Sequence, residues 1–142
     1  MICYWDTSAL IPAFIDEIDS EKVMKWFQKH SDSSHFTSWL TFFEFESVLR
    51  RKLNQKYITA QQYEKVQESW FLFQSGLNLV PLDSRSARQG LRFQKLYSLK
   101  PYDSIQLGSA SLLQLEYPEI QFACLDQRLA QIAKQEGFKN LD

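Results

Sequence analysis

Four acidic residues stand at positions where they could bind a divalent cation together. Asp6 and Asp126 each end a short apolar run, and Glu44 and Asp103 lie near the starts of amphipathic helical patterns. Carboxylates that converge in a partly desolvated cleft repel one another, which raises their pKa values and costs stability unless a cation neutralises them. Mg²⁺ and Mn²⁺ prefer such oxygen ligands. The four acids therefore predict a metal site that polarises a phosphate and activates water.

Each of these acids also has an ordinary structural role open to it. Asp6 and Asp126 fit helix N-caps that follow strands, and Thr41 with Glu44 fits a capping box. Asp103 stands in a first helical turn, where the helix dipole favours an acid. For any one acid alone, the structural role is the more common one. The four taken together favour a metal site.

The elements that must position these acids are short apolar runs alternating with longer helical patterns. The runs predict strands at 2–5, 35–39, 77–82 and 121–125, with one last short strand over 138–141. The patterns predict helices or helical turns at 7–14, 20–29, 41–52, 59–74, 83–97, 102–115 and 126–136. This alternation implies parallel pairing and an α/β sandwich. In such sheets ligands bind beyond the carboxyl ends of the strands, where Asp6 and Asp126 are expected.

The composition fits a single domain over residues 1–142, because 142 residues with 44% apolar side chains suffice for one core. The formal net charge of -1 gives no overall attraction to nucleic acid, so any such attraction must be local. Two basic groups either follow an RNA backbone or form solvated faces. The first, the candidate RNA-binding group, is Arg50, Arg51, Lys52 and Lys56, and the second is Arg85, Arg88, Arg92 and Lys95.

Cys3 and Cys124 lie in apolar runs without a CxxC partner, so we expect buried free thiols in a reducing compartment. Two His and two Cys make a structural zinc site improbable. Asp6 interrupts the opening apolar run, which argues against a signal peptide. No run approaches the roughly 20 apolar residues of a membrane-spanning helix. The expected protein is cytoplasmic and makes no membrane contact.

The sequences around the four acids resemble the motifs of PIN domains, particularly those of VapC-type toxins. The first motif is WDTSAL at 5–10, and the second is LTFFE at 40–44. The third is YDSIQLGSA at 102–110, and the fourth is CLDQRL at 124–129. Their order and spacing agree from residue 2 to the C-terminus. One position departs from the family pattern, because Cys124 stands where a Ser or Thr is usual, which puts a hydrogen bond supporting Asp126 in doubt.

The resemblance implies a three-layer α/β/α PIN-like fold with a short-stranded, mainly parallel central sheet. It also implies a Mg²⁺- or Mn²⁺-dependent endoribonuclease that hydrolyses RNA with metal-activated water, as the toxin of a toxin–antitoxin pair. Asp6, Glu44 and Asp103 would hold the metal, Asp126 would complete the acidic pocket, and Ser8 would support it through its hydroxyl. The implied partners are an RNA substrate, a cognate antitoxin protein and a second copy of the chain in a homodimer.

Aromatic side chains are dense between residues 39 and 73, and we expect that they do not all fit one small core. In VapC-like proteins this region packs against a second toxin or an antitoxin, so a groove that includes Phe43 and Trp70 is a hypothesis. Trp5 and Tyr102 adjoin motif acids and either stack on a base or pack in the core.

Three other functions compete with the toxin nuclease. One is a PIN nuclease for RNA maturation, or a structure-specific DNase, outside a toxin–antitoxin pair. Another is a catalytically inactive PIN-like module that binds RNA or protein, although all four acidic positions are filled. The last is an unrelated doubly wound domain, such as a phosphatase or receiver-like fold, but the segment Asp6-Thr7-Ser8 lacks the second Asp of a phosphotransfer motif.

Overall fold

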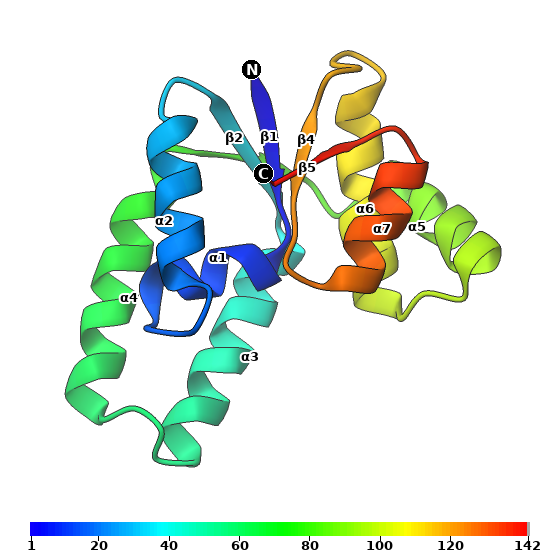
Figure 1. The fold of residues 1–142 in the computed structure, drawn as a ribbon. Coiled ribbons are helices and arrows are strands. Elements are labelled where there is room, and N and C mark those ends of the chain that lie inside the picture. Colours follow the sequence, from blue (N-terminus) through cyan, green and yellow to red (C-terminus); the bar gives the residue numbers. More distant parts are fainter. Residues whose placement is uncertain (142) are drawn as a thin grey trace.

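A computed structural model describes residues 1–141, so only residue 142 of the expected domain lies outside the described part. Five parallel strands form one sheet in the order β3-β2-β1-β4-β5 (Figure 1). The strands are β1 (Ile2–Trp5), β2 (Ser34–Ser38), β3 (Leu77–Val80), β4 (Gln121–Ala123) and β5 (Lys139–Asn140). The expectation of a short-stranded parallel sheet is confirmed.

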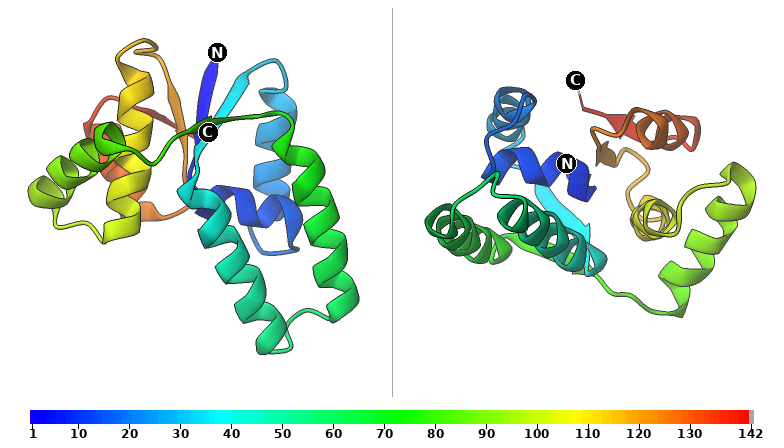
Figure 2. Two further views of the ribbon diagram at one scale, coloured as in Figure 1. Left: turned by 180° about the vertical axis from the view of Figure 1, so that it is seen from behind. Right: turned by 90° about the horizontal axis from the view of Figure 1, so that it is seen from below.

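Seven helices within residues 1–141 connect the strands. They are α1 (Thr7–Phe14), α2 (Ser20–Lys29), α3 (Leu40–Asn54), α4 (Ala60–Gln74), α5 (Ser84–Tyr97), α6 (Pro101–Gln114) and α7 (Gln127–Gln135). Helices α1 to α4 cover one face of the sheet and α5 to α7 cover the other, as both views of Figure 2 show. The three-layer arrangement is confirmed. None of these helices is long and apolar enough to cross a membrane.

The two-residue period of β1 divides the core between the two layers. Tyr4 faces α6 and stacks on Phe122 with ring centroids 5.6 Å apart. Trp5 faces the opposite layer and stacks on Phe27 at 4.2 Å. Successive side chains of a strand point to opposite faces, so β1 contributes to both cores. Of the two roles considered for Trp5, core packing is therefore correct.

The aromatic residues of α3 and α4 separate into core and surface. Trp70 is only 4% exposed and stacks on Phe45 with centroids 4.3 Å apart. The idea that Trp70 lines an open groove is therefore wrong, because the side chain fills the space between α3 and α4. Phe43 remains at the surface with 68% exposure.

Helices α5 and α6 approach each other closely at two glycines. A Cβ atom added to Gly108 would lie 2.4 Å from the backbone nitrogen of Gly90 and 2.8 Å from its Cα. No side chain fits between backbones at that separation. The contact holds α6, and with it Asp103, against the neighbouring helix.

Some predicted boundaries differ from the observed ones near the carboxyl edge of the sheet. The strand expected over 121–125 ends at Ala123, because the backbone N–H of Leu125 donates to the Ser8 hydroxyl at 3.0 Å instead of continuing a ladder. The helix expected from residue 41 begins at Leu40, so Glu44 is its fifth residue and lies beyond the first turn.

The strand order reverses direction beside β1. The chain runs from β1 to β2 and β3 on one side, and then crosses to β4 on the other side of β1. Parallel α/β sheets bind ligands at such a switch point, beyond the carboxyl ends of the strands. Asp6 directly follows β1 and Asp126 follows β4 by three residues, so both emerge at this point.

Candidate active site

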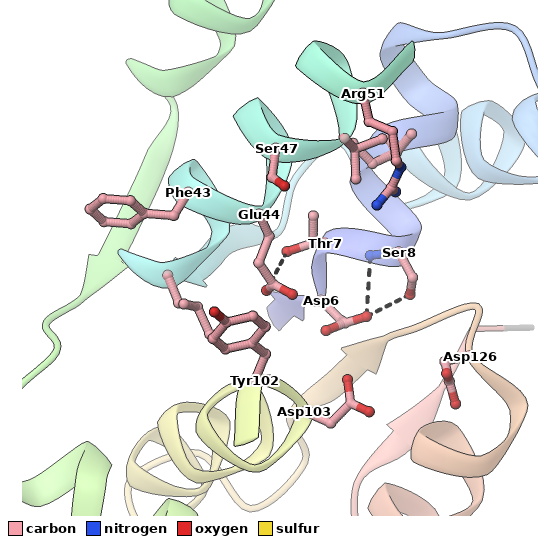
Figure 3. A pocket seen from close by; sticks show the side chains of 13 residues that line it. Asp6, Thr7, Ser8, Phe43, Glu44, Ser47, Arg51, Tyr102, Asp103 and Asp126 are labelled. Carbon is pink, nitrogen blue, oxygen red and sulfur yellow. Dashed lines mark hydrogen bonds between the residues drawn. The ribbon is translucent and has the colours of Figure 1, made fainter. Parts of the chain in front are cut away.

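The four acids come from four separate segments and line one cavity. It has a volume of about 580 Å³, and Figure 3 shows Asp6, Glu44 and Asp103 directed into it, with Asp126 at its edge. The remaining lining residues are Thr7, Ser8, Ile11, Leu40, Phe43, Ser47, Val48, Arg51 and Tyr102. An adjoining hollow of about 590 Å³ shares Glu44, Asp103 and Asp126 with it. Glu44, Asp103 and Asp126 therefore lie where the two hollows meet, and Asp6 lies in the first hollow alone.

Asp6 is the most buried of the four, at 5% exposure. Its Oδ2 accepts hydrogen bonds from the Ser8 hydroxyl at 2.5 Å and the Ser8 backbone N–H at 3.2 Å. The N-cap role considered for Asp6 is therefore real, yet it engages only that oxygen. Burial raises the pKa of Asp6 to about 6, with repulsion from Glu44 and Asp103 adding to the shift.

The Glu44 carboxylate accepts hydrogen bonds from two side chains and takes no part in a capping box. Its Oε1 accepts hydrogen bonds from the Thr7 hydroxyl at 3.0 Å and from Nε2 of Gln106 at 2.7 Å. The capping-box interpretation is wrong, because Trp39 occupies the N-cap of α3 and its side chain makes no capping hydrogen bond. Burial raises the pKa of Glu44, and the two donors oppose that rise.

Asp103 and Asp126 form the more open side of the cavity. Asp103 stands in the first turn of α6, as expected, and its pKa is raised by burial and then by repulsion from Asp126. Lys100 and Arg128 oppose the rise. Asp126 is exposed and caps α7, with its Oδ1 accepting from the backbone N–H of Leu129 at 2.9 Å. Both structural roles considered for these two acids exist beside their position in the cavity.

Cys124 contacts a different acid from the one its position suggests. Its Sγ lies 3.6 Å from Oδ2 of Asp6 and 3.5 Å from the backbone oxygen of Asp126, so the Asp126 carboxylate receives no bond from it. Burial, with repulsion from Asp6, raises the pKa of this thiol far above its ordinary value. The thiol is protonated near neutral pH. Cys3 and Cys124 are both free and buried, as expected.

The chemistry of these ligands suits a hard divalent cation. All four candidates offer oxygen, and among residues 1–141 no group donates a hydrogen bond to Oδ1 of Asp6 or Oε2 of Glu44. Within that range no three His, Cys, Asp or Glu side chains are grouped closely enough to hold an ion as they stand. The carboxylates that line the cavity would therefore have to move closer together to share one ion.

The first basic group does not act as one surface. Arg51 lines the cavity, whereas the Arg50 guanidinium lies over the Tyr63 ring at 5.6 Å. Lys52 pairs with Glu17 at 3.2 Å on another side of α3, and Lys56 is an exposed loop residue with a positive φ of 62°. Of the four candidates, Arg51 alone faces the acids.

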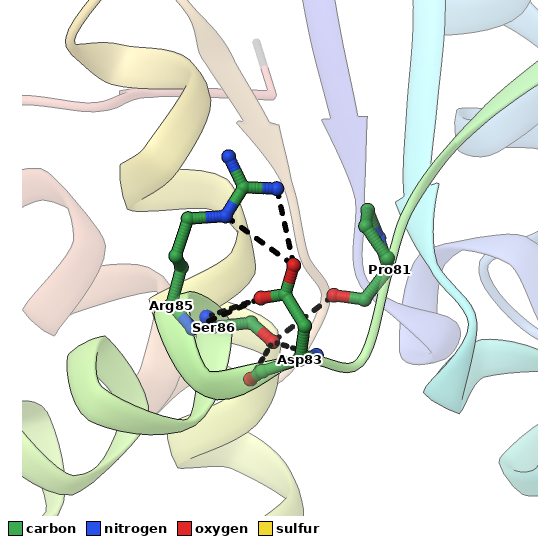
Figure 4. A network of polar contacts seen from close by, with 4 residues as sticks. All are labelled: Pro81, Asp83, Arg85 and Ser86. Atoms are coloured by element: carbon green, nitrogen blue, oxygen red, sulfur yellow. Dashed lines mark hydrogen bonds and ion pairs between the residues drawn. The ribbon is translucent and has the colours of Figure 1, made fainter.

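The second basic group belongs to α5, away from the cavity. Arg85 lies 3.1 Å from the carboxylate of Asp83, which caps the helix together with Ser86 (Figure 4). Arg92 covers the Phe93 ring at 4.3 Å. Neither arginine is among the residues that line the acidic cavity. Arg88 and Lys95 are likewise exposed and absent from that lining, so RNA binding by this group stays a hypothesis beside a solvated face.

Two polar residues beneath the acids were not predicted from the sequence. Thr7 and Gln106 both bond Glu44, and Gln106 is fully buried. A signal was present in the third motif, because a Gln three residues after Asp103 falls on the same helical face in a segment of small and apolar residues. Tyr102, considered for base stacking or for the core, is 61% exposed at the mouth of the cavity.

Comparison with known proteins identifies one family. The family model described as "PIN domain" matches residues 3–135. None of the curated proteins compared with the chain matches it.

Several solved structures share the fold. The structure of VapBC2 from Rickettsia felis, bound to a DNA fragment from the promoter, has a TM-score of 0.71 at 11% identity and is covered over 100% of both chains. DNA-bound VapBC from Salmonella typhimurium has a TM-score of 0.69 at 15% identity, with 99% of this chain and 96% of that chain covered. A toxin–antitoxin complex from Klebsiella pneumoniae has a TM-score of 0.64 at 17% identity, covering 89% and 88%.

Proposed function

The chain belongs to the PIN domain family, whose members are generally nucleases, and from this premise we propose that it is a metal-dependent endoribonuclease acting as the toxin of a toxin–antitoxin pair. The observation that carries the proposal is the meeting of Asp6, Glu44, Asp103 and Asp126 in one cavity at the switch point of the sheet. Three of these carboxylates have raised pKa values, which is the electrostatic condition that a cation relieves.

Each residue has a role that follows from its surroundings. Asp6, Glu44 and Asp103 would hold Mg²⁺ or Mn²⁺, with Asp126 completing the negative charge of the pocket. Ser8 keeps one oxygen of Asp6 engaged, so that the other is left for the cation. When bound, the metal supplies positive charge beside the scissile phosphate and lowers the pKa of the attacking water. Arg51 is suited to a neighbouring phosphate of the RNA backbone.

The partners proposed are an RNA substrate, an antitoxin protein and a second copy of the chain. The exposed apolar side chains Phe43, Phe71 and Leu72 on α3 and α4 support a protein partner, since large exposed aromatics are enriched at interfaces. The three structures compared above are a toxin–antitoxin complex and two DNA-bound VapBC complexes. We propose the cytoplasm, where thiols such as Cys3 and Cys124 stay reduced, as the compartment.

The test is incubation of the purified protein with end-labelled single-stranded RNA and with DNA of the same sequence, in Mg²⁺, Mn²⁺ or EDTA. We expect cutting of RNA in the metal buffers, none in EDTA, and products without a 2′,3′-cyclic phosphate, because water and not the 2′-hydroxyl attacks. Preferential cutting of DNA would show that the substrate is DNA and not RNA. No cutting, together with no heat of Mn²⁺ binding, would move the assignment to a module that binds RNA or protein without cleaving it.

The toxin assignment has its own test in bacterial growth. Induced expression should arrest growth, and the variant Asp103→Asn should not, provided that both accumulate to equal levels. If cells that express the active nuclease grow as fast as uninduced cells, the result would favour a PIN nuclease for RNA maturation over a toxin.

A further inference from the structure

A buried polar network lies beneath the acidic cavity, with Gln106 at its centre. The Gln106 side chain is 0% exposed and extends from α6 toward β1 and α3. Its Nε2 lies 2.7 Å from Oε1 of Glu44, 3.0 Å from the Thr41 hydroxyl and 3.2 Å from the Thr7 hydroxyl. Its Oε1 lies 2.6 Å from the Tyr4 hydroxyl. This single amide therefore joins three elements at the floor of the site.

Chemistry fixes which way the amide points. An ionised Glu44 carboxylate only accepts hydrogen bonds, so the Gln106 atom beside it must be the NH₂ group. The amide oxygen then faces Tyr4, whose hydroxyl must donate to it. The Tyr4 hydroxyl thus sets the orientation of Gln106, and Gln106 in turn presents an N–H to Glu44.

The remaining hydroxyls fit the same direction of donation. The Thr37 hydroxyl donates to the backbone oxygen of Trp5 at 2.8 Å, which uses its only hydrogen. Thr41 lies 2.7 Å from Thr37 and must therefore donate to it, leaving its own oxygen free to accept from Gln106. Each polar hydrogen of the Tyr4, Thr37, Thr41 and Gln106 side chains then has one acceptor, and networks satisfied in this way favour a single arrangement.

The consequence for Glu44 is that one oxygen is fixed and the other is left for the cavity. The Thr7 hydroxyl and the Gln106 amide both donate to Oε1. We propose that Gln106 is a positioning residue, oriented by Tyr4, that holds the Glu44 carboxylate ready for a divalent cation. The inference rests on the proposed function. Partners that orient metal ligands in this way typically change metal affinity by about 10–100-fold when they are lost.

A purely structural role would not require this amide. Burying a Gln amide is unfavourable unless its polar atoms have hydrogen-bond partners, and a Met of similar size would fill the same space without needing them. What the amide adds is a hydrogen bond that orients the Glu44 carboxylate, because its NH₂ group donates to Oε1 of Glu44. The two roles therefore predict different effects of a Met substitution. If Gln106 positions Glu44, metal affinity should fall; if Gln106 only packs in the core, stability alone should change.

The experiment measures Mn²⁺ affinity by calorimetry, and metal-free stability by denaturation in EDTA, for wild type and Gln106→Met. The matched control is Gln114→Met on the same helix, because Nε2 of Gln114 also donates a hydrogen bond, to the backbone oxygen of Glu136 at 2.8 Å, outside the cavity. We expect Gln106→Met to bind Mn²⁺ about 10–100-fold more weakly and the control to bind as wild type does. Unchanged affinity in folded Gln106→Met, or an equal loss in Gln114→Met, would overturn the inference.

A second variant alters the same hydrogen-bond network and leaves the Gln106 amide in place. Tyr4→Phe removes only the hydroxyl that orients Gln106, and we expect a smaller loss of Mn²⁺ affinity. In the double variant with Gln106→Met the Tyr4→Phe change should add nothing, because Tyr4 acts through Gln106. Full Mn²⁺ affinity in Tyr4→Phe, or additive losses, would contradict that route. Absence of Mn²⁺ binding by wild type would instead defeat the proposed function, and this inference with it.

Discussion

At the scale of single residues, Asp6 shows how a structural and a chemical role share one side chain. Its Oδ2 caps α1 through Ser8, while Oδ1 is left to the cavity. Burial is the main cause of its raised pKa, and the neighbouring acids add to it. In the metal-free protein at neutral pH, the ionised Asp6 is therefore a source of instability that a cation relieves.

The first prediction concerns stability without metal. The pKa of Asp6 is about 6 in the fold against an ordinary 3.8. Below pH 3.8 both folded and unfolded chains hold the proton, and stability is lost progressively as the pH rises from 3.8 through 6. The full loss is about 3 kcal/mol. Asp6→Asn avoids it and still accepts from Ser8, so in EDTA its free energy of unfolding should exceed that of wild type by about 1–3 kcal/mol at pH 7.5, and by less at pH 4.5.

Asp83→Asn is the control for this effect. Asp83 also caps a helix, but the hydrogen bond from Arg85 lowers its pKa, so its charge stabilises the fold above the ordinary pKa. Denaturation of Asp83→Asn at pH 7.5 should show a loss and not a gain. The result would contradict a destabilising charge on Asp6 if Asp6→Asn were no more stable than wild type at pH 7.5. A stability difference that is the same at pH 7.5 and pH 4.5 would contradict it as well.

At the scale of elements, one face of α3 combines an acid with a base. Glu44, Ser47 and Arg51 recur at intervals of three and four residues, so all three line the cavity. The neighbouring Arg50 points elsewhere and covers Tyr63. The sequence presents Arg50 and Arg51 as equivalent, and only the rotation of the helix relative to the sheet separates them.

Arg50 and Arg51 form a matched pair for a second prediction. Arg51→Ala should weaken binding of single-stranded RNA in EDTA and reduce the slope of log affinity against log salt by about 0.7, the amount expected for one phosphate contact. Arg50→Ala should leave the slope unchanged. Fluorescence anisotropy at several salt concentrations measures both. Equal effects of the two substitutions would show that Arg51 has no special contact with the RNA backbone.

The third prediction concerns how α5 and α6 are held together. Gly108→Ala would drive a methyl group into the backbone of Gly90, so we expect a loss of about 1–3 kcal/mol or more in the free energy of unfolding. Gly76→Ala is the matched control, because its Cβ would meet only the Phe73 backbone oxygen at 3.7 Å. Urea denaturation of both variants tests this. Similar stabilities would mean that the two helices can separate without cost.

At the scale of the whole molecule, the alternation of strands and helices could be predicted because apolar runs and helical periodicity are local signals. The strand order could not, since nothing local states that β4 pairs with β1 and not with β3. The acids could be found because Asp6 and Asp126 end apolar runs at strand ends. Gln106 and Thr7 were missed because their importance depends on Glu44, which is distant in sequence and meets them only in the fold.

If the acids of this cavity cut RNA with a divalent cation, their substitution must abolish cleavage. Cutting of end-labelled RNA in Mn²⁺ by matched variants measures this. Asp6→Asn and Asp103→Asn, each shown to be folded, should lose at least about 100-fold in rate, because each removes a proposed metal ligand. Asp83→Asn, an acid outside the cavity, should cut as wild type does. Wild-type rates in Asp6→Asn and Asp103→Asn would show that these carboxylates do not carry the cleavage.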